Sequence, residues 1–217
     1  MAYRLADQVT CCIADGTPIF LDARRRRYFG LGAQAASAFF DLLESGGRKP
    51  SADASLLVEM GLVEPTNDPR IETVNWTAPT TSILETEETT GKAALAAIVQ
   101  VGLSLVRSRS MLRRPIAEIF AALGERARPS GGAAPDVELI EASVRFHRAR
   151  RRVPISPICL QDSLAMLDFL RKRGLDADLV IGVRTYPFHA HCWLQAGSVV
   201  LNETLHDAAG HTPIRVL

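Results

Sequence analysis

The sequence predicts an α+β chain made of two folded parts that are joined by a polar segment. The first part opens with β-rich residues around a two-residue turn signal, Asp15-Gly16, and continues with helical periodicity. A stretch rich in Thr, Pro, Asn and Glu follows, and the second part runs from helical segments into closing strands. We therefore expect a first domain over residues 1–70, a linker over residues 71–91 and a second domain over residues 92–217.

Three strands followed by two helices are expected in the first part. The strands are predicted over residues 8–14, 17–22 and 27–31, which are rich in β-branched and apolar side chains. Helices are predicted over residues 34–44 and 51–60, where apolar side chains recur on one stripe and glycines follow. A three-stranded sheet with helices behind it resembles a winged helix-turn-helix.

Four helices and then three strands are expected in the second part. The helices are predicted over residues 92–107, 115–126, 136–152 and 159–173, and the strands over residues 177–183, 191–195 and 198–202. The second domain therefore combines a helical part with a small antiparallel sheet.

Composition argues against several classes of protein. A net charge of +1 over 217 residues gives no bulk attraction to nucleic acid or to a membrane surface. No secretory signal opens the chain, and its longest apolar run, residues 93–106, is too short to span a bilayer. The four cysteines lack the spacing of a zinc site, so we expect a cytoplasmic protein with reduced thiols and no metal.

The charge is unevenly distributed along the chain. Eleven arginines and few acids lie between residues 107 and 152. Such a stretch either forms a solvated helix surface or faces an acidic partner, and we interpret it as a solvated surface.

A candidate nucleophile stands where the last predicted helix starts. Cys159 follows Pro157-Ile158, so its sulfur would feel the positive end of the helix dipole beside unpaired N–H groups. This setting lowers the pKa of a thiol and supplies donors for an oxyanion. The alternative interpretation is a buried cysteine that only packs in the core.

A candidate general base follows on a predicted strand. His191 would share one face of that strand with His189 and Trp193. A lone strand histidine can also be purely structural, and two histidines at this spacing can bind a metal. Further ligands at suitable spacing are missing from the sequence, so we rank a metal below catalysis.

The group that would orient His191 depends on the strand register. With a two-residue loop at Ala196-Gly197, His191 faces Asn202, and with a three-residue loop it faces Glu203. Either side chain can accept a hydrogen bond from the imidazole, which is the third role in a catalytic triad.

A nucleophile on a helix, a histidine on a strand and then an acid or amide is the order found in papain-like and transglutaminase-like enzymes. The chain further resembles the lasso-peptide B protein, a transglutaminase-like leader peptidase. The motifs that carry the resemblance are Cys159-Leu160, Ser163-Leu164-Ala165, Leu170, Gly174, Ile181-Gly182-Val183 and His191-Cys192-Trp193. The family usually has Ala at position 192, and an Asp where this chain has Glu203.

The first seventy residues resemble the leader-recognition element that accompanies this peptidase, which is similar to the small chaperone of pyrroloquinoline quinone biosynthesis. The resemblance implies that a leader peptide adds as a strand beside residues 27–31. The basic run at residues 24–27 could attract acidic leader residues or only protect a strand edge. The candidate leader-binding residues are Arg27, Tyr28, Phe29, Leu31, Leu56, Leu57 and Met60. Each of these side chains could instead simply belong to the core.

The resemblance implies a function as well. A cysteine peptidase would bind the leader of a lasso-peptide precursor and cleave it off, and a cyclase of the asparagine synthetase type would then take the core. No cofactor is implied, and the absence of a Gly-rich phosphate loop argues against a nucleotide site. The alternatives are a transglutaminase-like acyltransferase and a non-catalytic protein that binds peptide or DNA. Against DNA, the basic run at residues 24–27 lies by a strand turn rather than on a recognition helix.

Overall fold

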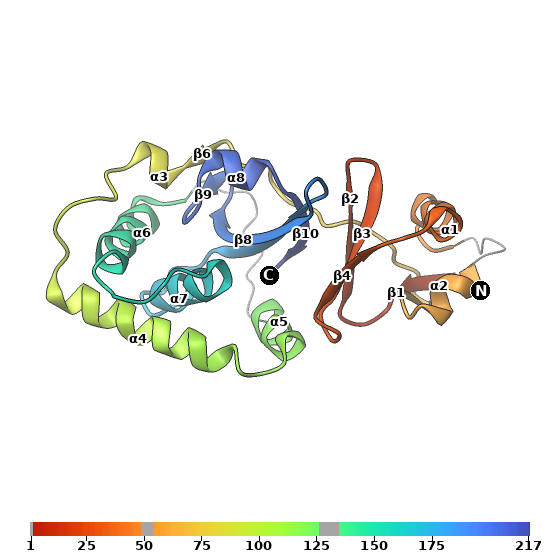
Figure 1. Cartoon of the computed structure of the whole chain (residues 1–217), viewed down its shortest axis with the longest axis horizontal. Coiled ribbons are helices and arrows are strands. Elements are labelled where there is room, and N and C mark those ends of the chain that lie inside the picture. The colour runs from red at the N-terminus through yellow and green to blue at the C-terminus, as the bar shows by residue number, and fades with distance from the viewer. Residues whose placement is uncertain (1, 49–53, 126–134) are drawn as a thin grey trace. The chain divides into compact units, whose positions relative to one another are not determined.

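The computed structural model describes residues 2–48, 54–125 and 135–217 (Figure 1). The chain divides into two compact units, residues 1–75 and residues 76–217. The division lies five residues beyond the predicted end of the first domain. Among the described residues, no helix is long and apolar enough to cross a membrane.

Unit 1 contains the three predicted strands as an antiparallel sheet in the order β2-β3-β4. Asp15 and Gly16 connect β2 to β3 with positive φ angles of 48° and 74°, the geometry that a two-residue hairpin turn requires. A second sheet, not predicted, pairs β1 with β5. The strands of unit 1 are β1 (Ala2–Leu5), β2 (Val9–Ala14), β3 (Thr17–Asp22), β4 (Arg27–Gly30) and β5 (Val63–Thr66).

Two helices of unit 1 contribute to its apolar core. Helix α1 (Ala33–Glu44) matches its prediction, and helix α2 (Ala54–Glu59) covers the described part of the second predicted helix. Phe39 of α1 packs edge to face against Phe20 of β3, with ring centroids 4.8 Å apart. Leu42 and Leu57 are fully buried in the same core. These contacts hold helices against strands, while the winged helix-turn-helix assignment stays a prediction.

Unit 2 contains a five-stranded sheet in the order β10-β7-β8-β9-β6. All neighbours in it are antiparallel except β6 and β9, which are parallel. The strands are β6 (Thr81–Ser82), β7 (Asp178–Arg184), β8 (His189–Ala196), β9 (Val199–Val200) and β10 (Thr212–Val216). The helices are α3 (Ile83–Thr86), α4 (Leu95–Met111), α5 (Ile116–Gly124), α6 (Val137–Arg150), α7 (Cys159–Arg171) and α8 (Leu205–Ala209).

Helix α7 occupies the middle of unit 2. It contacts β8 on one side and α4 and α6 on the other, as Figure 1 shows. Its inward side chains, among them Leu164, Phe169 and Leu170, are almost completely buried. Because α7 is fixed on both sides, the residue at its start is held rigidly against the sheet.

Part of the predicted linker belongs to the second unit instead. Residues 81–82 form β6, the edge strand beside β9, and residues 83–86 form α3. Ser82 caps this short helix through a hydrogen bond that its hydroxyl accepts from Leu84 N–H. Strand β6 has two residues and α3 has four, which is too short for an apolar pattern to recur, so the sequence predicted a linker there.

Candidate active site

Cys159 is the first residue of α7, as predicted, and its side chain is exposed. Ile158 precedes the helix in an extended conformation and provides no side-chain cap, so the first N–H groups of α7 stay available. Arg150 of α6 braces this start. Its guanidinium bonds both carboxylate oxygens of Asp162 at 3.0 and 3.2 Å and donates to the carbonyl of Ile155 at 2.9 Å.

His191 lies on β8 and contacts both other members of the predicted triad. Its Nε2 is 2.6 Å from a carboxylate oxygen of Glu203, and its ring also hydrogen-bonds the Cys159 sulfur. Because Nε2 is engaged by Glu203, Nδ1 is the nitrogen left for Cys159. The structure therefore brings Cys159, His191 and Glu203 into one hydrogen-bonded chain.

Neither predicted register occurs at the hairpin that follows β8. Ala196 pairs with Val199 and Gln195 with Val200, so the loop is Gly197-Ser198. Strand β9 then ends at Val200, whereas the predicted strand ran to residue 202. The turn was misplaced because Ala196-Gly197 and Gly197-Ser198 are both acceptable two-residue loops in the sequence.

Asn202, the alternative orienting residue, has different partners. Its side-chain oxygen accepts from Leu194 N–H at 2.6 Å, and its nitrogen donates to the Ser163 hydroxyl at 2.9 Å. Asn202 therefore joins β8 to α7. Among the described residues, no hydrogen bond connects its side chain to the imidazole of His191. Glu203 is the side chain that orients His191.

Glu203 is itself held by several groups. One carboxylate oxygen accepts from Thr204 N–H at 2.8 Å while the other bonds His191, and the carbonyl of Glu203 accepts from the Ser82 hydroxyl at 2.6 Å. Nearby, Nε2 of His147 from α6 lies 2.8 Å from the carbonyl of Leu201. These bonds fix the turn that carries the carboxylate.

The hydrogen bonds around Cys159 and His191 shift the pKa of both groups and favour a thiolate beside an imidazolium. The pKa of Cys159 is lowered to about 4, first by a hydrogen bond from the Cys192 thiol and next by one from His191. The pKa of His191 is raised to about 9, because its ring bonds the Cys159 sulfur and the Glu203 carboxylate. Between these two values the sulfur is a nucleophile and the imidazole carries a proton that it can donate.

Cys192 extends the polar chain beneath the nucleophile. It lies next to His191 on β8, is 6% exposed, and donates to Cys159 through both its thiol and its backbone N–H. Ser163, one helical turn after Cys159, bonds the sulfur of Cys192 and also accepts from Asn202. The pKa of the Cys192 thiol is raised, chiefly by its hydrogen bond to Cys159, so Cys192 stays protonated and acts as a donor.

Two further histidines lie beside His191, one stacked on its ring and one tilted against it. His189, His191 and Trp193 share one face of β8, as predicted, with successive ring centroids 5.8 and 6.4 Å apart. His211, which the sequence did not single out, lies 5.6 Å from His191 and receives a 2.9 Å hydrogen bond from His189. It accepts at Nε2 because its Nδ1 donates to the carbonyl of Asp207.

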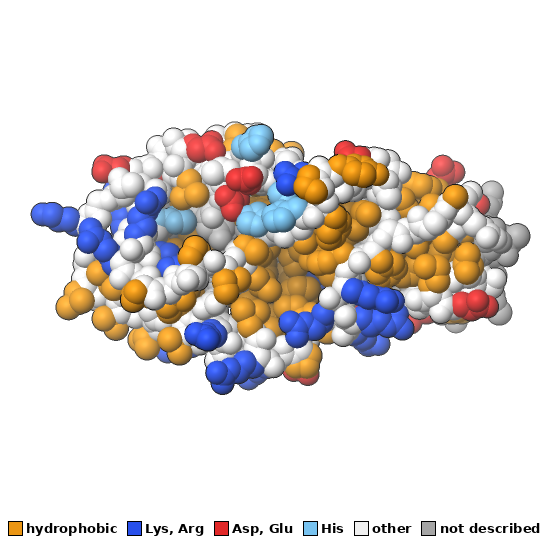
Figure 2. All heavy atoms as spheres, in the orientation of Figure 1, with side chains coloured by type: hydrophobic (Ala, Val, Ile, Leu, Met, Phe, Trp, Pro, Cys, Tyr) orange, Lys and Arg blue, Asp and Glu red, His pale blue; other side chains and the backbone are white. Residues whose placement is uncertain are grey.

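Gly182 makes room for this stack. A Cβ atom there would lie 2.8 Å from Cβ of His211 and 2.9 Å from the Trp193 ring, closer than packed atoms approach. Steric exclusion of a Cβ atom thus explains the glycine in the Ile181-Gly182-Val183 motif. Figure 2 shows histidine side chains gathered beside acidic ones on the surface of this unit.

The candidate leader-binding residues of unit 1 lie in two places: on and just after β4, and on and just after α2. Within the described residues β4 pairs only with β3, so its other edge has no strand beside it. Tyr28, Phe29, Leu31, Leu56 and Met60 are partly exposed, and Arg27 is exposed with its guanidinium 5.0 Å from the Phe29 ring centre. Leu57 is fully buried in the core, so it is not available to a peptide.

No group of three or more His, Cys, Asp or Glu side chains in the described ranges is arranged to hold a metal ion. All four cysteines are free thiols.

Comparison with known proteins places this geometry in context. Residues 101–216, which contain the whole triad, match the model of the transglutaminase-like superfamily. Over 45 residues the chain is 49% identical to the microcin J25-processing protein McjB of Escherichia coli. That stretch covers 21% of this chain and 22% of McjB, about a fifth of either protein. No solved structure matches the chain.

Proposed function

Because the chain belongs to the transglutaminase-like superfamily, we propose that it is a cysteine peptidase that removes the leader from a lasso-peptide precursor. The observation that carries the proposal is the hydrogen-bonded chain from Cys159 through His191 to Glu203 at the start of α7. The partial similarity to a microcin-processing protein supports a peptide precursor as the substrate.

The geometry supports an acyl-enzyme mechanism. The Cys159 thiolate attacks the carbonyl carbon at the junction of leader and core, and N–H groups at the start of α7 stabilise the oxyanion. His191 then donates its Nδ1 proton to the leaving amine, which becomes the N-terminus of the core. Water, deprotonated by His191, attacks the thioester and releases the leader with a free carboxylate. Glu203 keeps the imidazole oriented throughout.

Unit 1 is proposed to hold the leader. The edge of β4 away from β3 has no strand beside it among the described residues and can bind an extended peptide through main-chain hydrogen bonds. The partly exposed Leu31, Leu56 and Met60 can contact its apolar side chains. Tethering raises the effective concentration of the scissile bond at Cys159. In this proposal the freed core then goes to a separate ATP-dependent cyclase of the asparagine synthetase type.

Incubation with the cognate precursor, followed by mass spectrometry, tests the reaction. The wild-type chain should yield a free core and a leader one water heavier than the acyl fragment, and Cys159→Ala should yield neither while still binding the leader. Cys11→Ala is the matched control, since this buried thiol lies in unit 1. Cleavage by Cys159→Ala would reject the nucleophile, and a leader joined to an added amine would indicate an acyltransferase.

Leader recognition is tested separately from catalysis. Leu31→Ser combined with Leu56→Ser should raise KM for the full precursor about tenfold and leave kcat unchanged, because both side chains belong to the proposed docking surface. A short peptide that spans the cut but lacks the leader should be cleaved equally by both forms. An unchanged KM for the precursor would remove unit 1 from the mechanism.

A further inference from the structure

Helix α4 is apolar on two opposite sides. Its inner side chains, such as Val101 and Leu105, are fully buried against the rest of unit 2. Its outer side carries four large aliphatic residues with high exposure: Leu95 at 76%, Val99 at 54%, Leu103 at 51% and Val106 at 61%. Eight large hydrophobic side chains are exposed among the described residues, so half of them lie on this one helix.

The four residues form a continuous stripe. Their spacing of four, four and three residues places them on one face of α4, roughly opposite the buried face. We refer to Leu95, Val99, Leu103 and Val106 as the α4 stripe. A helix in a globular protein normally exposes a polar outer face, so an apolar stripe of this kind indicates a candidate binding surface.

The charges on α4 and at its two ends have one sign, although one of them, Arg107, is paired with Asp168 of α7 at 3.7 Å. Residues 91–114 contain five cations and no acid. The cations are Lys92, Arg107, Arg109, Arg113 and Arg114. Four of the five lie toward the C-terminal end of α4, and Figure 2 shows Lys and Arg side chains at that end of a row of hydrophobic ones.

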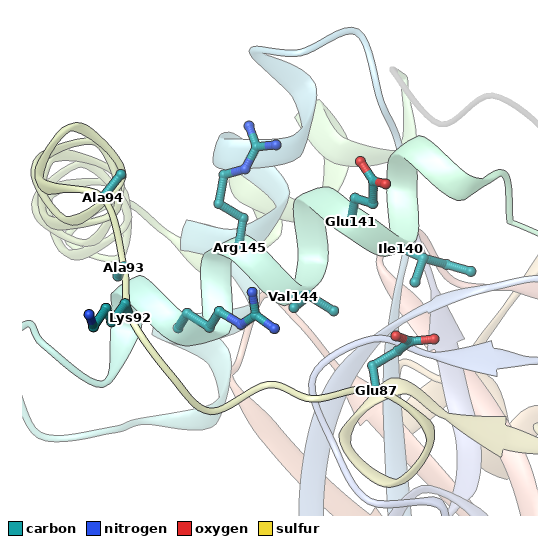
Figure 3. Close-up of a pocket in the computed structure, with 9 residues that line it drawn as sticks. Glu87, Lys92, Ala93, Ala94, Ile140, Glu141, Val144 and Arg145 are labelled. Carbon is teal, nitrogen blue, oxygen red and sulfur yellow. The ribbon is translucent and has the colours of Figure 1, made fainter.

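Two hollows flank the helix. One, of about 330 Å³, lies between α4 and α7 and is lined by Leu103 and Phe169 together with Arg107, Lys172 and Arg173. The other, of about 470 Å³, lies between residues 92–94 and α6, where Glu87 and Glu141 offset the cations (Figure 3). The net positive field is therefore concentrated beside the C-terminal half of the stripe.

These features discriminate between possible occupants. A second copy of the chain would bring two sets of these cations together, which like-charge repulsion opposes. A bilayer surface is flat and is usually bound by helices with Trp or Phe on the apolar face, whereas the stripe has no aromatic residue and has a hollow beside it. An amphipathic helix with acidic flanks matches the apolar row, the concave border and the charge.

We propose that the α4 stripe is the docking site for an acidic amphipathic helix of a partner protein, with the acidic residues of that helix facing Arg107 and the arginines beyond it. The stripe contains none of the triad residues, so the proposal stands independently of the peptidase function.

A synthetic probe tests the site directly. A fluorescent 18-residue helical peptide with one Leu row flanked by Glu would be titrated with the full chain carrying Cys159→Ala, which prevents cleavage. We expect saturable binding by anisotropy, and about tenfold weaker binding of the same peptide with Lys in place of Glu. Val99→Ser with Leu103→Ser should weaken binding of the Glu peptide about tenfold or more.

Control variants separate the stripe from a general effect of apolar surface. Val137→Ser, at an aliphatic residue of α6 that is 71% exposed, should leave binding unchanged, and circular dichroism should show that the double variant is folded. Equal binding of the Glu and Lys peptides, or no effect of the double variant, overturns the proposal. It is also overturned if the double variant abolishes binding to anionic vesicles, or converts a dimer into a monomer in light scattering, because the occupant would then be a membrane or a second copy.

Discussion

Replacement of Cys192 by alanine should make the nucleophile harder to ionise without destroying the site. The Cys192 thiol is the largest single contributor to the low pKa of Cys159, and the backbone N–H of residue 192, which also donates, is retained in the variant. A hydrogen bond to a charged group contributes about 1.5–3 kcal/mol, and 1.36 kcal/mol corresponds to one pKa unit. The pKa of Cys159 should therefore rise from about 4 to about 5–6.

The assay is the rate of iodoacetamide labelling of Cys159 as a function of pH, followed by peptide mass spectrometry. Because the pKa is lowered in the folded chain, thiolate is present above about pH 4, and labelling should rise through that value in the wild type. In Cys192→Ala the rise should move to higher pH, whereas the alkaline loss of peptidase activity near pH 9, set by deprotonation of His191, should change little.

Cys11 and Cys12 provide an internal reference in the same experiment. Burial raises the pKa of each to about 12, so both should label slowly over the whole range, and Cys12→Ala should not move the profile of Cys159. If the labelling rate of Cys159 rises over the same pH range in Cys192→Ala as in the wild type, the thiol of residue 192 does not stabilise the thiolate, and the reasoning is refuted.

Three other substitutions test the scaffold around the nucleophile. Glu203→Gln should reduce kcat/KM about 100-fold or more. It should also move the alkaline loss of activity to lower pH, because the carboxylate helps to raise the pKa of His191. An alkaline loss at the same pH as in the wild type would argue against this role. Gly182→Ala should destabilise the chain by about 1–3 kcal/mol in urea unfolding, because the added methyl group overlaps Trp193, and a neutral result would show that the stack can shift. Arg150→Met should cost about 2–3 kcal/mol by leaving a largely buried carboxylate of α7 unpaired, and calorimetry that detects no loss would contradict this.

The elements that sequence predicted well are those with a complete local pattern. The hairpin at Asp15-Gly16 needs two residues that tolerate positive φ, and the sequence supplies them at the right place. Helix α7 starts at Cys159, immediately after an extended residue, and Gly174 follows its end with a positive φ of 75°. In both cases the residues that define the element are close together in the sequence, so the prediction did not require knowledge of tertiary contacts.

The elements that sequence missed depend on distant partners. Strand β6 has two residues and exists because it pairs with β9, over one hundred residues later. His211 lies on the segment that leads into β10, and it reaches His191 only because β10 pairs with β7 and Gly182 leaves space. Neither position carries a local pattern, so sequence could name His191 as a candidate but not the histidine stacked against it.

The identity of the orienting acid does not follow from the register of the hairpin. Continuing the observed ladder from Ala196 and Val199 would place residue 204, not residue 203, opposite His191. Strand β9 ends at Val200, however, and the turn that follows is fixed through Ser82 and Thr204, which leaves position 203 off the ladder. A side chain at that position must reach back toward the imidazole while its second oxygen bonds the neighbouring N–H. Glu203 does so from outside the ladder, with a 2.6 Å contact to Nε2 of His191 and a 2.8 Å hydrogen bond from Thr204 N–H.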